Sequence, residues 1–374
     1  MNTVMSIFKP RILEIDYVPG AYIKEFEGWR GVAILLVVLL HYSQSIFTFG
    51  WVGMELFFVL SGFFITGILF DSKSKKSYYL PFLKRRVLRI FPLYYLCLFI
   101  LFVLLPRSWL NLEYYRSHQV WFWLYVDNWL YAIDGWPEVK SLHHFWSLAI
   151  EEQFYILWPL AVWMSSAKGL IRFCIFLIFF SLIFRNAGMR LGFVMPFPYV
   201  ATFGRMEGLA LGSMVAVMLR SEKWKLMLEK FAYPVTVISG GVAILVFLLA
   251  RSMQFWNPFH YTINYTVLDI FFAGMITLTL CRNQFTRLKK VLANRALCQI
   301  GVMSYCIYIF HYPILGIVEY NFSEYFGRLT HHDGLAKLCC VSMAVLVTIP
   351  IVYFFHKKVE LPIWQLKKRS SMRS

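Results

Sequence analysis

The sequence predicts an all-α polytopic membrane protein with about ten transmembrane helices and both termini in the cytoplasm. The 374-residue chain is 59% hydrophobic and only 15% charged, whereas soluble domains carry about 25% charged residues. It contains repeated windows of predominantly apolar residues that are long enough to cross a bilayer as helices. Its Lys and Arg residues are also concentrated in alternate loops, as the positive-inside rule describes.

Ten windows are apolar enough to be predicted as membrane spans, and the fifth and sixth are the least distinct. They cover residues 31–48, 51–70, 89–105, 146–164, 170–184, 204–219, 234–250, 264–281, 300–319 and 338–355. The aromatic segment 121–131 is too short to span, so we expect it to lie at the membrane interface.

The distribution of positive charge predicts the orientation. A large majority of the 37 Lys and Arg residues lie in five polar regions and one short turn. These are the N-terminal segment, the loops 71–89, 220–230 and 282–295, the turn near Lys168, and the segment after residue 357. Ten spans and a cytoplasmic N-terminus place all of them on the cytoplasmic side. The net charge of +17 is then explained by anionic membrane lipids and an anionic ligand, without a nucleic-acid partner.

No internal repeat or linker divides the chain. We therefore predict one integral-membrane domain over residues 1–365, followed by a basic cytoplasmic tail over 366–374. The longest loop on the extracytoplasmic side covers residues 106–145, and this loop is expected to cap a site.

The first predicted span has Arg30 at its start and His41 deep inside it. Residues 11 positions apart lie on nearly the same helix face, which puts His41 about 16 Å further along that face. Ionisable groups at membrane depth are costly and usually functional, and histidine is suited to accept a proton near neutral pH. The alternative is a structural histidine bonded between helices. We predict a functional role for the pair.

Further polar residues at membrane depth point to a polar cavity. Adjacent helical residues point about 100° apart, so only one of two neighbouring carboxylates is expected to face a given site. Residues at i, i+4 and i+7 form a stripe on one helix face. Any single member could merely join two helices, but together they favour a site. The members are Glu55, the neighbours Glu151 and Glu152, Asp269, and the stripe of Ser304, Tyr308 and His311.

A basic segment precedes the third span in the run FLKRRVLRIFP, which starts at Phe82. Ordinary positive-inside anchoring explains such a segment. Arg89, however, lies at i+4 from Arg85 and at i+3 from Arg86, so a helix would bring the three together. Clustered arginines bind phosphate groups through forked hydrogen bonds. The segment is therefore a candidate anion site as well as an anchor.

Taken together and in order, these motifs resemble acyltransferase family 3, the membrane-integral O-acyltransferases of cell-surface polysaccharides and related acceptors. The resemblance runs from Glu27 to about Pro362. It rests on EGWRG with the Arg30 to His41 spacing, FFVLSGFFI, FLKRRVLRIFP, FWSLAIEEQFY, RMEGLALG, SYCIYIFH and a late VELP. The family usually has Asp where this chain has Glu27 and Glu55. The sequence also shows no appended hydrolase-like domain, so a stand-alone transferase is expected.

The resemblance implies a multi-pass plasma-membrane enzyme that takes an acyl group from cytoplasmic acyl-CoA, most simply acetyl-CoA, to a hydroxyl of a carbohydrate or glycolipid acceptor. His41 would be the general base, and Glu151 or Glu152 would orient that histidine or the acceptor. No bound cofactor or metal is implied. The donor-binding residues would be Arg30, Arg85, Arg86 and Arg89, and the supporting residues Glu27, Glu55, Ser147, Arg205, Glu207, Ser304, Tyr308 and His311.

Two other functions use similar residues. A transporter or flippase for a sugar or lipid-linked sugar could use the buried polar groups as a substrate or proton pathway. Such proteins more often show internal repeats and matched broken helices. A membrane enzyme of lipid-linked glycosyl transfer is the third possibility, and it often needs clustered acidic groups that bind a metal near the phosphate.

Overall fold

The computed structural model describes residues 13–43, 46–75, 77–193 and 195–363. Within these ranges the secondary structure is helical, apart from one isolated β-bridge between Ile15 and Cys281. The long helices are α2 (Lys24–Tyr42), α3 (Val52–Ser72), α4 (Tyr79–Phe99), α8 (Trp146–Met164), α9 (Ala167–Arg190), α11 (Met206–Met218), α12 (Glu222–Ala250), α13 (Tyr265–Thr279), α16 (Ser304–Thr330) and α17 (Asp333–Phe355). The short helices are α5 (Glu113–Ser117), α6 (Gln119–Trp123), α7 (Asp127–Asp134), α10 (Phe197–Val200), α14 (Thr286–Leu292) and α15 (Arg295–Val302).

Each of the ten apolar windows falls on one of these long helices, which confirms the all-α class. Six helical stretches within the described residues are long and apolar enough to cross a membrane, and the bent pair α15 and α16, which meet at 71°, would make a seventh. The chain is therefore a multi-pass membrane protein. Ten spans with two cytoplasmic termini stay a prediction, and the predicted tail 366–374 lies outside the described residues.

Three helices that coincide with predicted spans belong neither to those six stretches nor to the bent pair, for visible reasons. Helix α2 carries Glu25, Glu27 and Arg30 within 19 residues. The apolar sequence of helix α8 is interrupted by the polar run that begins at Glu151, although the helix is continuous. Helix α11 has only 13 residues. The charged residues that lower the mean hydropathy of α2 and α8 include the candidate site residues Glu27, Arg30, Glu151 and Glu152. Such charges are tolerated at membrane depth when they face the interior of the bundle.

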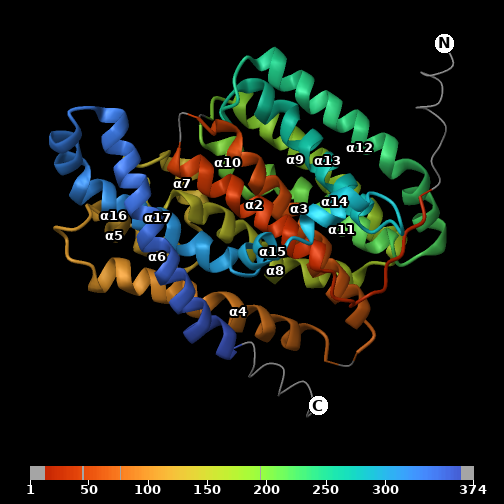
Figure 1. Ribbon diagram of the computed structural model, residues 1–374. Coiled ribbons are helices and arrows are strands. Elements are labelled where there is room, and N and C mark those ends of the chain that lie inside the picture. The colour runs from red at the N-terminus through yellow and green to blue at the C-terminus, as the bar shows by residue number, and fades with distance from the viewer. Residues whose placement is uncertain (1–12, 44–45, 76, 194, 364–374) are drawn as a thin grey trace.

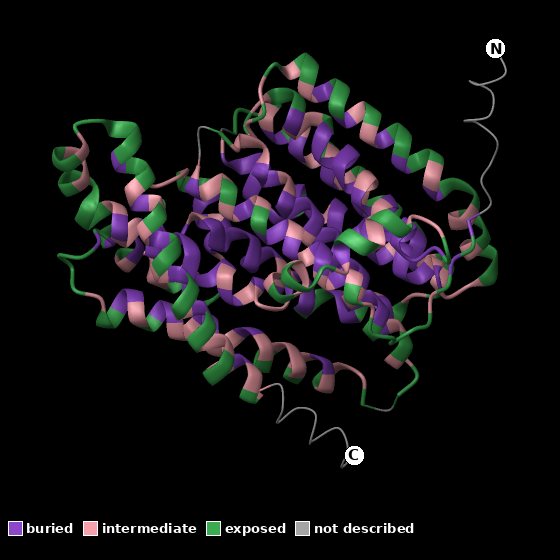
Figure 2. Cartoon of the chain, viewed as in Figure 1, coloured by how far each residue is buried: buried purple, intermediate pink, exposed green. Residues whose placement is uncertain are grey.

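Helix α3 lies at the centre of the bundle and packs on α2, α8, α11 and α13. Figure 1 shows α4 along one edge and α12 along the opposite edge, with α2 and α3 between them. In the apolar window of Thr48–Ser72, 72% of the residues are buried, against 28% for α12 and 22% for the stretch that contains α17. The outer helices thus turn apolar side chains outward, as lipid contact requires, and Figure 2 shows the buried residues gathered in the middle.

The crossing of α3 and α11 depends on glycine. A Cβ atom at Gly62 would lie 2.0 Å from the backbone oxygen of Leu209, and one at Gly212 would lie 1.9 Å from the backbone oxygen of Val59. Any larger residue would force the two backbones apart. Small residues allow such close approach in membrane bundles. Gly62 and Gly212 therefore allow the close crossing, and the contact holds the residues of α3 in register with those of α11.

Candidate active site

A cavity of about 240 Å³ opens between α2, α3, α4, α8 and α16. We call it the arginine cavity, because Arg30, Arg86 and Arg89 line it. Glu151 and Glu152 line it as well. Four other predicted site residues also line it, namely Glu27, Ser147, Ser304 and Tyr308. Nine predicted site residues from four helices thus meet around one space.

Arg30 joins two helices at this cavity. Its Nη1 donates to Glu27 Oε2 at 3.0 Å, one turn earlier on α2, and its Nη2 donates to Ser304 Oγ at 2.9 Å at the start of α16. The guanidinium side chain is 14% exposed. Three residues that the sequence analysis named as site residues therefore form one hydrogen-bonded group, in which the carboxylate of Glu27 holds the arginine.

The arginines of the basic segment lie on two different faces of α4. Arg86 lies over the rings of Phe82, at 5.6 Å, and Tyr155, at 5.7 Å. Arg86 and Arg89 line the cavity, whereas Arg85 is not among its lining residues. Adjacent helical residues point about 100° apart, so the helix that presents Arg86 to the cavity turns Arg85 away. The structure thus brings Arg30, Arg86 and Arg89 to one cavity and leaves Arg85 outside it.

Both carboxylates of the pair on α8 line the arginine cavity. The expectation that only one would face a given site is wrong, because the cavity wraps around this part of the helix. Glu151 accepts hydrogen bonds from Ser61 Oγ at 2.7 Å and from Tyr155 Oη at 3.0 Å, while Glu152 Oε1 has no hydrogen-bond partner among the described residues. Neither of the Glu151 bonds involves His41, so the structure gives no support for a carboxylate that orients this histidine.

A second cavity of about 290 Å³ lies further along α2 and is lined by His41, His143 and His144. We call it the histidine cavity. Residues 136–144 of the loop 106–145 form one wall, and the segment 254–256 contributes another part. The long loop therefore borders a cavity, and its role as the cap of a functional site stays a prediction. The lining as a whole is rich in aromatic rings, namely Trp136, Trp146, Tyr199, Phe255, Trp256, Tyr308 and Tyr312.

His41 is oriented by His311. The Nδ1 atom of His311 lies 2.9 Å from the carbonyl oxygens of both Ile307 and Tyr308. Carbonyl oxygens only accept, so this Nδ1 carries the proton, and in a neutral ring Nε2 is then an acceptor. His41 Nδ1 lies 2.7 Å from that Nε2 and must donate to it. A neutral His41 is thereby left with an unprotonated Nε2, the form required of a general base.

The other rings around His41 complete its environment. Tyr312 stacks on it with a centroid distance of 4.1 Å and an interplanar angle of 5°. His144 lies 5.9 Å from His41 and 5.1 Å from His311 between ring centroids. Both ring nitrogens of His144 are buried without a hydrogen-bond partner among the described residues. Buried polar atoms are normally bonded, so a bound hydroxyl or water is expected to fill this role.

His143 has a different character. It lies in the loop before α8, stacks on Trp136 at 4.5 Å, and donates from Nε2 to the Pro137 carbonyl at 2.9 Å. Burial lowers the pKa of His143 to about 3, because the charged ring loses its hydration. It is therefore neutral at physiological pH and forms part of an aromatic wall.

Beneath the histidine cavity, two fully buried ion pairs join α3, α9 and α11. Arg205 Nη2 donates to Glu55 Oε1 at 2.6 Å, and Arg185 Nη1 donates to Glu207 Oε1 at 2.6 Å. Arg205 also lies over four aromatic rings, the nearest being Tyr265 at 4.4 Å. Two of the others, Trp146 and Tyr199, line the histidine cavity. Glu55, Arg205 and Glu207 thus support the wall of the site and do not line either cavity.

The family model described as the acyltransferase domain matches residues 23–357. The chain belongs to this acyltransferase family. The match covers every predicted site residue, both cavities and the loop 106–145, and it confirms the resemblance drawn from the motifs.

Curated members of the acyltransferase family are similar to this chain along most of its length. Peptidoglycan O-acetyltransferase OatA of Listeria monocytogenes is 28% identical over 79% of the chain and 49% of its own length. O-acetyltransferase OatA of Staphylococcus aureus is 27% identical over 94% of the chain and 58% of its own length. Putative peptidoglycan O-acetyltransferase YrhL of Bacillus subtilis is 28% identical over 80% and 49%. The chain spans about half the length of these curated relatives, and no solved structure matches it significantly.

In this member of the family, several residues that the fold brings to the site or its supporting wall were not predicted from the sequence. Met54 and Tyr312 look like ordinary residues of an apolar span, and Arg185 lies in the largely apolar helix α9. His144 lies directly before the motif FWSLAIEEQFY, and this position was the one signal that pointed to it. Arg185 directly follows the predicted span 170–184 and was a comparable signal, because a charge at membrane depth needs a buried partner.

Proposed function

We propose that this chain is a membrane-bound O-acyltransferase that moves an acetyl group from cytoplasmic acyl-CoA to a hydroxyl of an extracytoplasmic cell-wall carbohydrate. The observation that carries the proposal is the pair of cavities, one lined by arginines and the other by histidines, that meet inside the bundle. The printed names of the relatives, which describe O-acetyltransferases acting on peptidoglycan, support the group transferred and the class of acceptor.

In this proposal the arginine cavity receives the donor. Arg30, Arg86 and Arg89 would bind its phosphates by charge-assisted hydrogen bonds, at the end of the bundle that the positive-inside rule assigns to the cytoplasm. The narrow pantetheine arm would extend toward the histidine cavity and carry the thioester with it. CoA then remains on the cytoplasmic side throughout the reaction.

The histidine cavity would receive the acceptor. Its aromatic rings offer flat faces to a sugar, and the unpartnered nitrogens of His144 offer hydrogen bonds to sugar hydroxyls. His41 Nε2 would take the proton of the reacting hydroxyl while the hydroxyl oxygen attacks the thioester carbonyl. The carbon–sulfur bond then breaks, and the imidazolium returns the proton to the departing thiolate. The products are an O-acetyl ester and free CoA.

The experiment that tests the function is release of CoA thiol by purified protein in detergent, given acetyl-CoA and a panel of glycan acceptors. We expect release that depends on the acceptor, together with an O-acetylated glycan detected by mass spectrometry. If folded protein releases no thiol with any acyl-CoA and any acceptor, the acyl-CoA transferase is refuted, and transport of a sugar or lipid-linked sugar becomes the better explanation of the buried polar groups.

Substituting the arginines of α4 should separate donor binding from chemistry. Arg89→Ala and Arg86→Ala are each expected to raise the KM for acetyl-CoA by about 10- to 100-fold, because a hydrogen bond to a charged group is worth about 1.5–3 kcal/mol. The turnover number should fall much less. Steady-state kinetics with varied acetyl-CoA at saturating acceptor measures both parameters.

Two neighbours of these arginines provide the comparison. Lys84 is exposed in the same basic segment, so Lys84→Ala should leave both parameters unchanged. Arg85→Ala is the discriminating variant, since the structure turns it away from the cavity. Equal increases in donor KM for Arg85→Ala and Arg89→Ala would mean that the segment acts through its overall charge and contains no defined phosphate site.

A further inference from the structure

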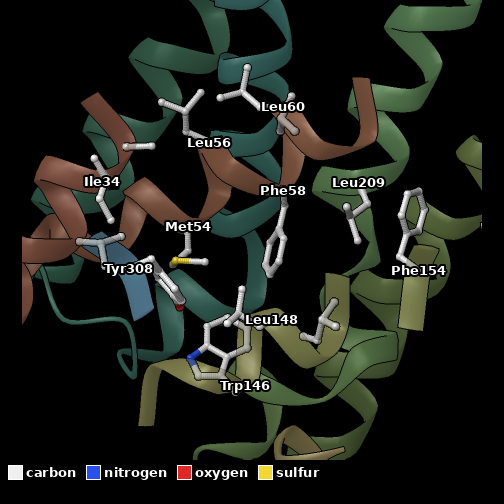
Figure 3. Packing of buried hydrophobic residues seen from close by; sticks show 14 of the residues in the cluster. Ile34, Met54, Leu56, Phe58, Leu60, Trp146, Leu148, Phe154, Leu209 and Tyr308 are labelled. Atoms are coloured by element: carbon white, nitrogen blue, oxygen red, sulfur yellow. The ribbon is translucent and has the colours of Figure 1, made fainter. Parts of the chain in front are cut away.

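The two cavities share a boundary made by two side chains. Of the described residues, only Met54 and Tyr308 line both the arginine cavity and the histidine cavity. Figure 3 shows the thioether of Met54, from α3, lying directly beside the ring of Tyr308, from α16. Both side chains are almost fully buried, with 6% and 5% exposure. His41 lies on the far side of this boundary from the arginines.

The two side chains differ in freedom of movement. The Tyr308 hydroxyl donates to the carbonyl oxygen of His144 at 2.5 Å and lies 2.6 Å from Ser147 Oγ, which can donate to it. These two bonds hold the ring against α8. The Met54 side chain makes no hydrogen bond to any residue that the structure describes, and the unbranched thioether of methionine adapts its shape readily. Tyr308 is thus a fixed wall, and Met54 is the part of the boundary able to move.

We infer that Met54 and Tyr308 form a gate that selects the length of the transferred acyl chain. This inference rests on the proposed function, in which the thioester enters from the arginine cavity and reacts at His41. To reach His41, the acyl group has to pass between these two side chains and occupy space that Met54 holds. An acetyl group adds one methyl beyond the carbonyl, whereas each further methylene displaces Met54 further against closely packed neighbours.

The gate also limits a side reaction. While Met54 closes against Tyr308, water in the histidine cavity is separated from a donor bound among the arginines. The thioester becomes accessible only when the acyl group itself moves Met54 aside. A smaller residue at position 54 should therefore increase hydrolysis of acetyl-CoA in the absence of acceptor, in addition to admitting longer chains.

The experiment compares acetyl-, propionyl-, butyryl- and hexanoyl-CoA as donors for wild type, Met54→Ala and Met54→Val. In wild type, kcat/KM should fall by about tenfold or more from acetyl to butyryl, the discrimination that one or two methylenes provide in an apolar pocket. Met54→Ala should raise the ratio of butyryl to acetyl transfer by at least about tenfold. Met54→Val should raise it less, and this variant preserves the test if the alanine variant does not fold.

Leu56 supplies the matched control. It is fully buried on the same helix and lines neither cavity. Leu56→Ala removes a similar volume, so it should lower stability without altering the ratio of butyryl to acetyl transfer. A folded Met54→Ala enzyme that transfers acetyl with the wild-type chain-length profile and wild-type hydrolysis would overturn the gate alone. Wild-type protein that uses no thioester would overturn the proposed function and the gate with it.

Discussion

His41→Ala is expected to lower acceptor-dependent release of CoA thiol by about 10²–10⁴-fold, the usual contribution of a positioned general base. The effect should appear in kcat, with the KM for acetyl-CoA nearly unchanged, because the arginines that bind the donor lie in the other cavity. The protein should still insert and fold, since the lost contacts are one hydrogen bond to His311 and ring contacts with Tyr312, His311 and His144. Steady-state kinetics and size-exclusion chromatography measure the two expectations.

His118 is a suitable comparison, because it lies in the loop 106–145 and lines neither cavity. His118→Ala should retain wild-type turnover. Near-normal turnover in His41→Ala would show that another group removes the proton and that His41 only packs between helices.

His311 should act as a positioning residue for His41. His311→Leu is expected to lower kcat strongly without changing the KM for the donor, because His41 loses the acceptor that holds its proton on Nδ1. His311→Gln should recover part of this loss, since the Gln Oε1 can accept the same hydrogen bond. Equal kcat values for the Leu and Gln variants would show that His311 contributes packing and has no effect on the orientation of His41.

Breaking the ion pair between Glu55 and Arg205 is expected to produce the largest loss of stability. Both side chains are 1% exposed, and their atoms lie 2.6 Å apart. Glu55→Ala leaves the guanidinium buried without its carboxylate, which costs about 3–5 kcal/mol in buried pairs of this kind. Glu55→Gln should cost less, because the amide oxygen still accepts the hydrogen bond. Thermal unfolding in detergent, followed by a thiol-reactive or tryptophan probe, measures the difference.

An exposed pair provides the contrast. Glu324 and Arg328 are bonded on the surface of α16, with side chains 79% and 77% exposed, and Glu324→Ala should leave the unfolding temperature unchanged, because exposed pairs contribute little. A Glu55→Ala protein with wild-type unfolding temperature would mean that water reaches Arg205. Turnover should also fall in Glu55→Ala, since Arg205 supports Trp146 and Tyr199 at the histidine cavity.

The predicted fold and the predicted site followed from different kinds of pattern. Apolar windows located every long helix because lipid-facing surfaces require runs of apolar residues, whatever the packing. The buried partners of the charged residues were not visible in that pattern. Glu151 or Glu152 was expected to orient His41 or the acceptor, but the hydrogen-bond partner of His41 is His311, which is 270 positions away. The sequence could not distinguish Arg85 from Arg86. The orientation of α4 about its axis places Arg86 at the arginine cavity and turns Arg85 away from it.

The sequence by itself determined that this chain crosses a membrane repeatedly, that Arg30 and His41 share one face of a helix, and that its motifs are those of an acyltransferase family. These properties depend on local spacing and on the cost of polar groups in lipid. Only the tertiary structure decided that His311 orients His41, that Arg205 pairs with Glu55, and that Met54 meets Tyr308 between the cavities. These contacts join helices far apart in the chain. Helix packing, set by close crossings such as that at Gly62, determines which side chains meet.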